Sequence, residues 1–196
     1  MTHWFEYSIG AVHMQNAKDC VGKMLDVIYK EEGFIYGEKE NEIFFDNTRY
    51  GVLAIYSINA SLETVVAITS RELQIKEKSF KDRIDILIKR EIITKKVTFQ
   101  RLNLLRKKRN LITHWEQVHI ELLGTDSYLP VMFTKISPKN KIEELISILT
   151  LNRMSQYIDD LLDLLNDIVS NIDREKYGGL YDSLKQIIDR DFVVGY

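Results

Sequence analysis

A short polar stretch of the sequence has the residue types needed for phosphodiester chemistry. If residues 98–117 form a helix, Arg109, Asn110 and His114 share one face, because successive residues are turned by about 100°. A guanidinium can hold a phosphate through paired N–H donors and stabilise charge that develops on it. A histidine can move a proton to or from the 2′-hydroxyl of RNA near neutral pH, and the Asn110 amide could orient the His114 ring. This face predicts RNA cleavage; the alternative is an exposed polar face with an incidental histidine.

Basic residues surround the predicted face. Arg106 and Thr113 lie on the same arc of the helix, and we expect both to contact RNA. Residues 76–109 contain 13 Lys or Arg and 4 Asp or Glu, which gives this segment a charge of +9 inside a chain of net charge -2. Within it, Lys95 and Lys96 are expected to bind RNA phosphates. The alternative for the basic segment is a solvated helix face.

The six residues 109–114 read R-N-L-I-T-H, an R-N-x-x-x-H string. The string resembles the signature of the HEPN (higher eukaryotes and prokaryotes nucleotide-binding) domains, an all-α family with many metal-independent ribonucleases. The resemblance implies that Arg109 and His114 are catalytic, that Asn110 supports them, and that neither a metal nor a cofactor takes part. One HEPN subgroup, whose toxins are modified by a nucleotidyltransferase antitoxin, has Tyr two residues after the histidine, where this chain has Glu116.

The resemblance also concerns partners. RNA cleavage through a cyclic phosphate benefits from two proton-transfer groups, and the sequence has a single R-N-x-x-x-H string. A two-fold homodimer would supply the string twice, an arrangement that HEPN relatives commonly use. We therefore expect an endoribonuclease of defence or toxin–antitoxin type that acts on RNA as a homodimer, with a neutralising antitoxin or regulatory protein as a further partner. The alternatives are a catalytically silent HEPN-like module that binds a protein or a nucleotide, and an unrelated helical bundle.

The hydrophobic pattern predicts an all-α, HEPN-like bundle of about five to six helices that forms one domain over residues 1–196. We expect the helices over about residues 3–32, 46–70, 80–93, 98–117, 139–172 and 180–189. Asp46 or Asn47 is expected to cap the second helix and Ser79 the third, with a loop or short hairpin over residues 34–45. Gly178-Gly179 is expected to end the fifth helix. The apolar side of the motif helix is expected in the core, with Leu104, Leu111 and Trp115.

Composition excludes several classes of protein. Hydrophobic residues are 45% and charged residues 29% of the 196, enough apolar material for a core, which excludes a disordered chain. The single cysteine, Cys20, cannot form an internal disulfide; it is expected to be a core thiol in a cytoplasmic protein. No run approaches the ~20 apolar residues of a membrane helix, so no membrane partner is expected. Four aspartates on one helix are expected to form a solvated acidic stripe rather than a metal site: Asp159, Asp160, Asp163 and Asp167.

Overall fold

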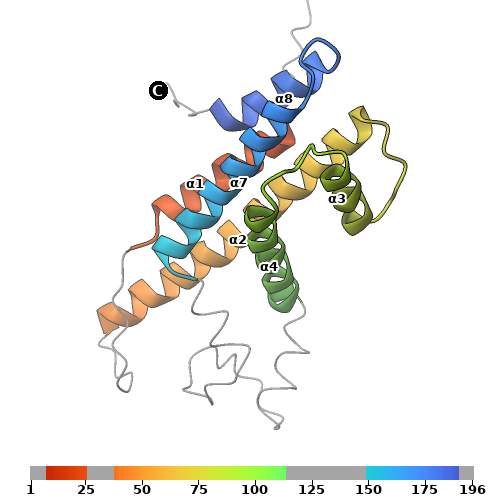
Figure 1. The fold of residues 1–196 in the computed structure, drawn as a ribbon. Helices are drawn as coiled ribbons and strands as arrows, with labels where there is room; N and C mark the ends of the chain where they lie inside the picture. Colours follow the sequence, from red (N-terminus) through yellow and green to blue (C-terminus); the bar gives the residue numbers. More distant parts are fainter. Residues whose placement is uncertain (1–7, 26–37, 114–148, 190–196) are drawn as a thin grey trace, which may run out of the picture.

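The computed structural model describes residues 8–25, 38–113 and 149–189. In these ranges it has six helices and no strand, which confirms the predicted all-α bundle (Figure 1). The helices are α1 (Ile9–Gly22), α2 (Glu38–Glu72), α3 (Phe80–Lys89), α4 (Lys96–Thr113), α7 (Leu151–Asn171) and α8 (Gly178–Asp189).

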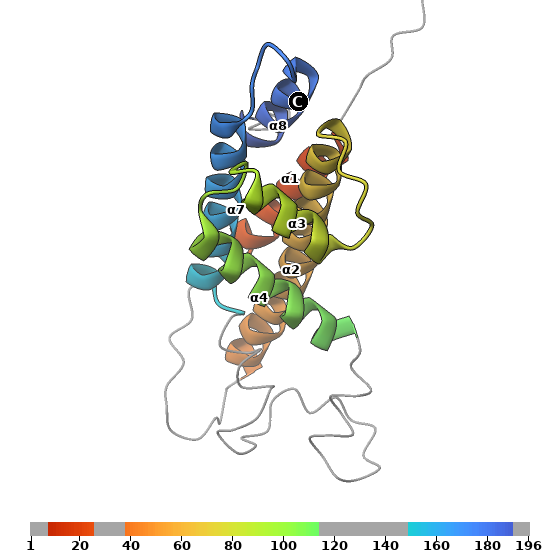
Figure 2. The same ribbon diagram turned by 45° about the vertical axis from the view of Figure 1, so that its right-hand side comes forward.

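The long helix α2 is the centre of the bundle. It contacts α1, α3, α4, α7 and α8, and α1 and α7 also contact each other. Figure 2 shows α3 and α4 crossing in front of α2. The fully buried side chains of α2 include Ile55, Ile58 and Leu62, and their removal from water is the main favourable contribution to folding. Gly51 lets the chain before α7 approach α2 closely, because a Cβ at this position would lie 2.9 Å from Cδ2 of Leu149.

The chain leaves α1 earlier, and enters α2 earlier, than the pattern predicts. α1 ends at Gly22, and the backbone N–H of Lys23 donates to the carbonyls of the preceding turn. The Asn47 side chain then accepts from the backbone N–H of Leu25 at 2.8 Å and donates to its carbonyl at 2.7 Å. Asn47 is thus not the cap of α2. Its buried side chain instead binds the backbone of Leu25, just after the end of α1. Because α2 begins at Glu38, the predicted loop is helical from residue 38 onward.

The boundary between α7 and α8 also differs from the prediction. α7 ends at Asn171, and Ile172 takes an extended backbone conformation in which its side chain is buried. The Asp173 carboxylate then accepts from the backbone N–H of Glu175, which forms a tight turn into α8. Gly178 is the first residue of α8, so the glycine pair does not end the preceding helix as expected.

Helix starts are set by side-chain caps at two positions. Ser79 accepts from the backbone N–H of Asp82 at 3.1 Å, as predicted for the start of α3. Thr150 accepts from the backbone N–H of Arg153 at 3.3 Å and has non-helical backbone angles. The cap at Thr150 starts α7 at Leu151, so the helix predicted over residues 139–172 does not run through residue 150.

One helical stretch among the described residues has the length and apolar composition of a membrane span. It is Asp46–Glu72 of α2, and half of its most apolar window is buried inside the fold. A central core helix meets the same criteria of length and composition.

Cys20 of α1 is partly buried against the core, and burial raises the pKa of its thiol.

Candidate functional site

The face of α4 that packs on the bundle differs from the predicted one. Leu102 and Leu105 are fully buried, whereas Leu104, which we expected in the core, is 53% exposed. Arg109 lies four residues after Leu105 and seven after Leu102, so it shares their side of the helix. The motif arginine therefore faces α2, because apolar residues occur on two sides of α4 and, within the described part of the fold, the side with Leu102 and Leu105 is the packed one.

Two arginines of the predicted site bind the same oxygen of α2. Arg109 Nη2 lies 3.0 Å, and Arg106 Nε 3.2 Å, from Oε1 of Glu63. The Arg106 guanidinium also lies over the Phe80 ring, 4.5 Å from its centroid. The fold thus joins residues of α2, α3 and α4 at one point. We name Arg106 and Arg109 the arginine pair, and Glu63 is the partner that they share.

Sequence reasoning missed Glu63, which is more than forty residues from both arginines. A signal for it exists in the sequence: Glu63 is the one charged residue between Arg49 and Arg71, in an otherwise small and apolar stretch of the central helix. A lone charge in such a stretch indicates a contact with a group of opposite sign where the helix packs.

The arginine pair is partly enclosed. The Arg109 side chain is 24% exposed, and its Nε is buried and donates to no acceptor among the described residues. Glu63 is more accessible, with 38% of its side chain exposed. A partly buried guanidinium interacts with anions more strongly than one in bulk water.

The last turn of α4 is tied to α2 by hydroxyl groups. Thr113 Oγ1 donates to the carbonyl of Arg109 at 2.9 Å and lies 3.0 Å from the hydroxyl of Tyr56. Because a threonine hydroxyl has one hydrogen, Tyr56 is the donor in the second contact. The Thr113 hydroxyl, predicted to contact RNA, thus has two partners within the fold. Asn110, which follows Arg109 in the sequence, is exposed.

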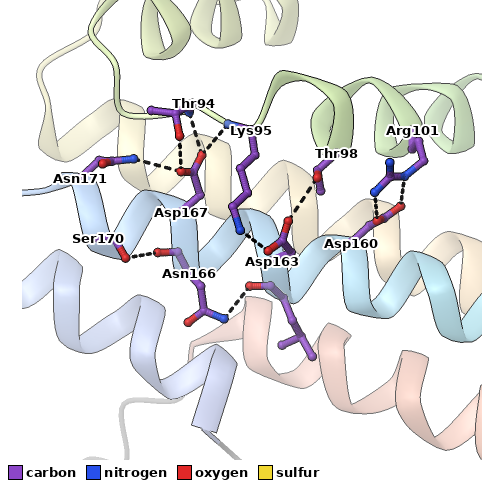
Figure 3. Close-up of polar contacts among 11 residues, drawn as sticks. Thr94, Lys95, Thr98, Arg101, Asp160, Asp163, Asn166, Asp167, Ser170 and Asn171 are labelled. Carbon is purple, nitrogen blue, oxygen red and sulfur yellow. Dashed lines mark hydrogen bonds and ion pairs between the residues drawn. The ribbon is translucent and has the colours of Figure 1, made fainter.

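The start of α4 is held by Asp167 of α7 (Figure 3). Its carboxylate accepts from the backbone N–H groups of Thr94 and Lys95, at 2.7 and 3.0 Å, and from the Thr94 hydroxyl at 2.6 Å. Burial alone raises the pKa of Asp167, but these hydrogen bonds and one from Asn171 outweigh it, and the net pKa is lowered. A carboxylate at a helix N-terminus also interacts favourably with the helix dipole.

Two more aspartates of α7 hold the first turns of α4. Asp163 binds Lys95 Nζ and accepts from the Thr98 hydroxyl at 3.1 Å, and Asp160 binds Arg101 through both carboxylate oxygens (Figure 3). The hydrogen bond to Asp163 raises the pKa of Lys95. The prediction of a solvated acidic stripe is therefore wrong for this face of α7, since its carboxylates pair with α4. Asp159, one turn before Asp163, is exposed.

The predicted RNA-binding residues fall into two groups. Arg106, Arg109 and Thr113 lie together against α2. Lys95 and Lys96 lie at the opposite end of α4, about 20 Å away at 1.5 Å per residue. Both lysines are exposed, and Lys95 is paired with Asp163.

Some predicted features lie outside the described residues. They include His114, Trp115, Glu116 and the side chain of Leu111. Parts of the predicted helices and of the predicted loop also lie outside them: residues 3–7, 26–37, 114–117 and 139–148. No group of three or more His, Cys, Asp or Glu side chains suited to a metal ion occurs in the described ranges. No protein-family model matches the chain, and no curated protein or solved structure shows significant similarity to it.

Proposed function

We propose that the chain is a metal-independent endoribonuclease in which the motif end of α4 acts on RNA. The observation that carries this proposal is the convergence of two guanidiniums, Arg106 and Arg109, at one point beside the motif. Such a preorganised pair is suited to bind a phosphodiester and to stabilise charge that develops on it. The R-N-x-x-x-H string supplies the remaining groups, Asn110 and His114.

The reaction is transfer of the phosphoryl group to the neighbouring hydroxyl. The 2′-oxygen forms a bond to phosphorus while the bond to the 5′-oxygen breaks, which leaves a 2′,3′-cyclic phosphate and a 5′-hydroxyl. One imidazole takes the proton of the 2′-hydroxyl, and a proton-donating group protonates the leaving 5′-oxygen. Arg109 stabilises the negative charge on the phosphate, Asn110 orients the His114 ring, and a two-fold homodimer supplies the second His114.

Substitution of the motif residues tests this proposal. In EDTA, the parent chain should cut a single-stranded or loop RNA, and Arg109→Ala and His114→Ala should each lose about 10²–10⁴-fold in rate. Lys107→Ala is the matched control, because Lys107 is an exposed cation on the same helix and should leave the rate within about twofold. Equal cutting by all four proteins would show that the site is assigned wrongly.

The second candidate is a catalytically silent module that binds a protein or a nucleotide. It is favoured by the contacts that engage Arg109 and Thr113 inside the fold, since both residues then have a structural use. Binding of RNA without any cleavage, or binding of a partner protein without RNA, would support this candidate instead. An active ribonuclease would harm its host, so a neutralising partner is part of the first proposal only.

A further inference from the structure

The contact between the arginine pair and Glu63 has the composition of an occupied anion site. Two guanidinium nitrogens, Arg106 Nε and Arg109 Nη2, lie within 3.2 Å of one carboxylate oxygen. We propose that Glu63 occupies the place of a substrate phosphate, and that RNA binds the arginine pair by displacing this carboxylate. The identity of the ligand as RNA rests on the proposed function; the competition between Glu63 and a phosphate does not.

Each guanidinium has support that does not depend on Glu63. Arg106 stacks on Phe80, whose ring centroid lies 6.4 Å from that of Phe99 in a stacked pair. Arg109 is enclosed on the packed side of α4, with its Nε buried. If Glu63 turns away, these contacts keep the two guanidiniums near each other. Because the two positive charges repel, binding of another anion between them is then favourable.

Glu63 itself is free to leave. Its side chain is 38% exposed, more than that of either arginine, so its carboxylate can turn into water and be rehydrated there. A tetrahedral phosphate presents several oxygens and can accept from both guanidiniums at once. A lone phosphate gains little by this exchange, because one anion replaces another. An oligonucleotide adds contacts with neighbouring phosphates. Competition with Glu63 therefore leaves free phosphate weakly bound while an oligonucleotide still binds.

The test compares Glu63→Gln with Glu72→Gln, which removes the same charge from the same helix near Arg71. The probe is a 2′-O-methyl oligonucleotide, which cannot be cleaved by 2′-hydroxyl attack. Glu63→Gln should bind the oligonucleotide about tenfold more tightly than the parent, and Glu72→Gln within about twofold of it. Unchanged or weaker binding by a folded Glu63→Gln protein overturns the proposal and makes Glu63 a positioning residue.

Two further arms separate the alternatives. Adding Phe80→Leu to Glu63→Gln should abolish the gain, since Arg106 then loses its support; a gain that persists means that the pair is not the site. Inorganic phosphate should bind more weakly than the oligonucleotide to both proteins, because it lacks the contacts of neighbouring phosphates. A gain with phosphate and none with the oligonucleotide overturns the assignment to nucleic acid.

The outcome is independent of catalysis. If the parent never cuts RNA but Glu63→Gln binds the oligonucleotide more tightly, the proposed ribonuclease fails and the competition stands. If cutting requires Arg109 but Glu63→Gln binds more weakly, the ribonuclease stands and the competition fails.

Discussion

The carboxylates of Asp167 and Glu63 each accept more than one hydrogen bond, but they differ in their exposure to water. Asp167 is 6% exposed and accepts from backbone and side-chain groups at the start of α4. Glu63 accepts from two guanidiniums and is far more exposed. A buried carboxylate with fixed donors is costly to lose from the fold, because its donors remain unsatisfied. An accessible carboxylate between two cations can instead be replaced by another anion.

The lowered pKa of Asp167 makes the fold sensitive to acid. A carboxyl whose pKa is lower in the folded than in the unfolded chain adds stability above its unfolded pKa, about 3.9 for Asp. This stability is lost as the pH falls through the lowered folded pKa. Asp167→Asn should lower the free energy of unfolding at pH 7 by about 1–3 kcal/mol and reduce its dependence on pH below about 4.

Asp159→Asn is the control for this prediction, because Asp159 is exposed on the same helix and the charge change is identical. Denaturant unfolding of both variants at pH 7 and at several pH values below 4 provides the measurement. If both variants unfold alike, the hydrogen bonds of Asp167 do not stabilise α4.

At the scale of the helices, α4 is held by hydrogen bonds and ion pairs at both ends and by buried leucines between them. α7 holds its start through Asp160, Asp163 and Asp167, and α2 holds its end through Glu63 and Tyr56. The existence of α4 could be predicted from the sequence, and so could the Ser79 cap at the start of α3. The orientation of α4 could not, because its apolar residues lie on two sides and the partners of its arginines are far away in sequence.

A pair of adjacent leucines tests the orientation of α4. Leu105→Ala should lower the free energy of unfolding by about 2–5 kcal/mol, since it leaves a cavity in the core. Leu104→Ala should change it by less than about 0.5 kcal/mol, since this side chain is mostly in water. Thermal or denaturant unfolding of the two variants gives the comparison. A larger loss for Leu104→Ala would mean that the other face of α4 is packed.

At the scale of the whole molecule, folding brings acidic residues next to the basic segment. The basic segment of residues 76–109 is partly neutralised by aspartates of α7 and by Glu63, all of which lie outside it in sequence. The all-α class could be predicted from periodicity, and a candidate site from one six-residue string. The neutralisation could not, because a local charge count does not contain the partners that the fold brings to it.

We expect the active molecule to be a homodimer with two motif helices at one cleft. Light scattering at micromolar concentration should give twice the mass of the chain, which is 23.0 kDa. Mixing the inactive Arg109→Ala and His114→Ala chains should restore part of the activity, because each chain supplies the group that the other lacks. A monomer that stays fully active at all dilutions would contradict a shared site.

The chemistry of the RNA ends tests the central claim most directly. In EDTA, the parent chain should convert an RNA with one cleavable linkage into a fragment with a 2′,3′-cyclic phosphate and a fragment with a 5′-hydroxyl, as resolved by mass spectrometry. A 2′-deoxy substitution at that linkage, or His114→Ala in the protein, should abolish both products, because each removes a group that the transfer requires. Cleavage that survives the 2′-deoxy substitution, or products with a 5′-phosphate, would contradict the proposed mechanism.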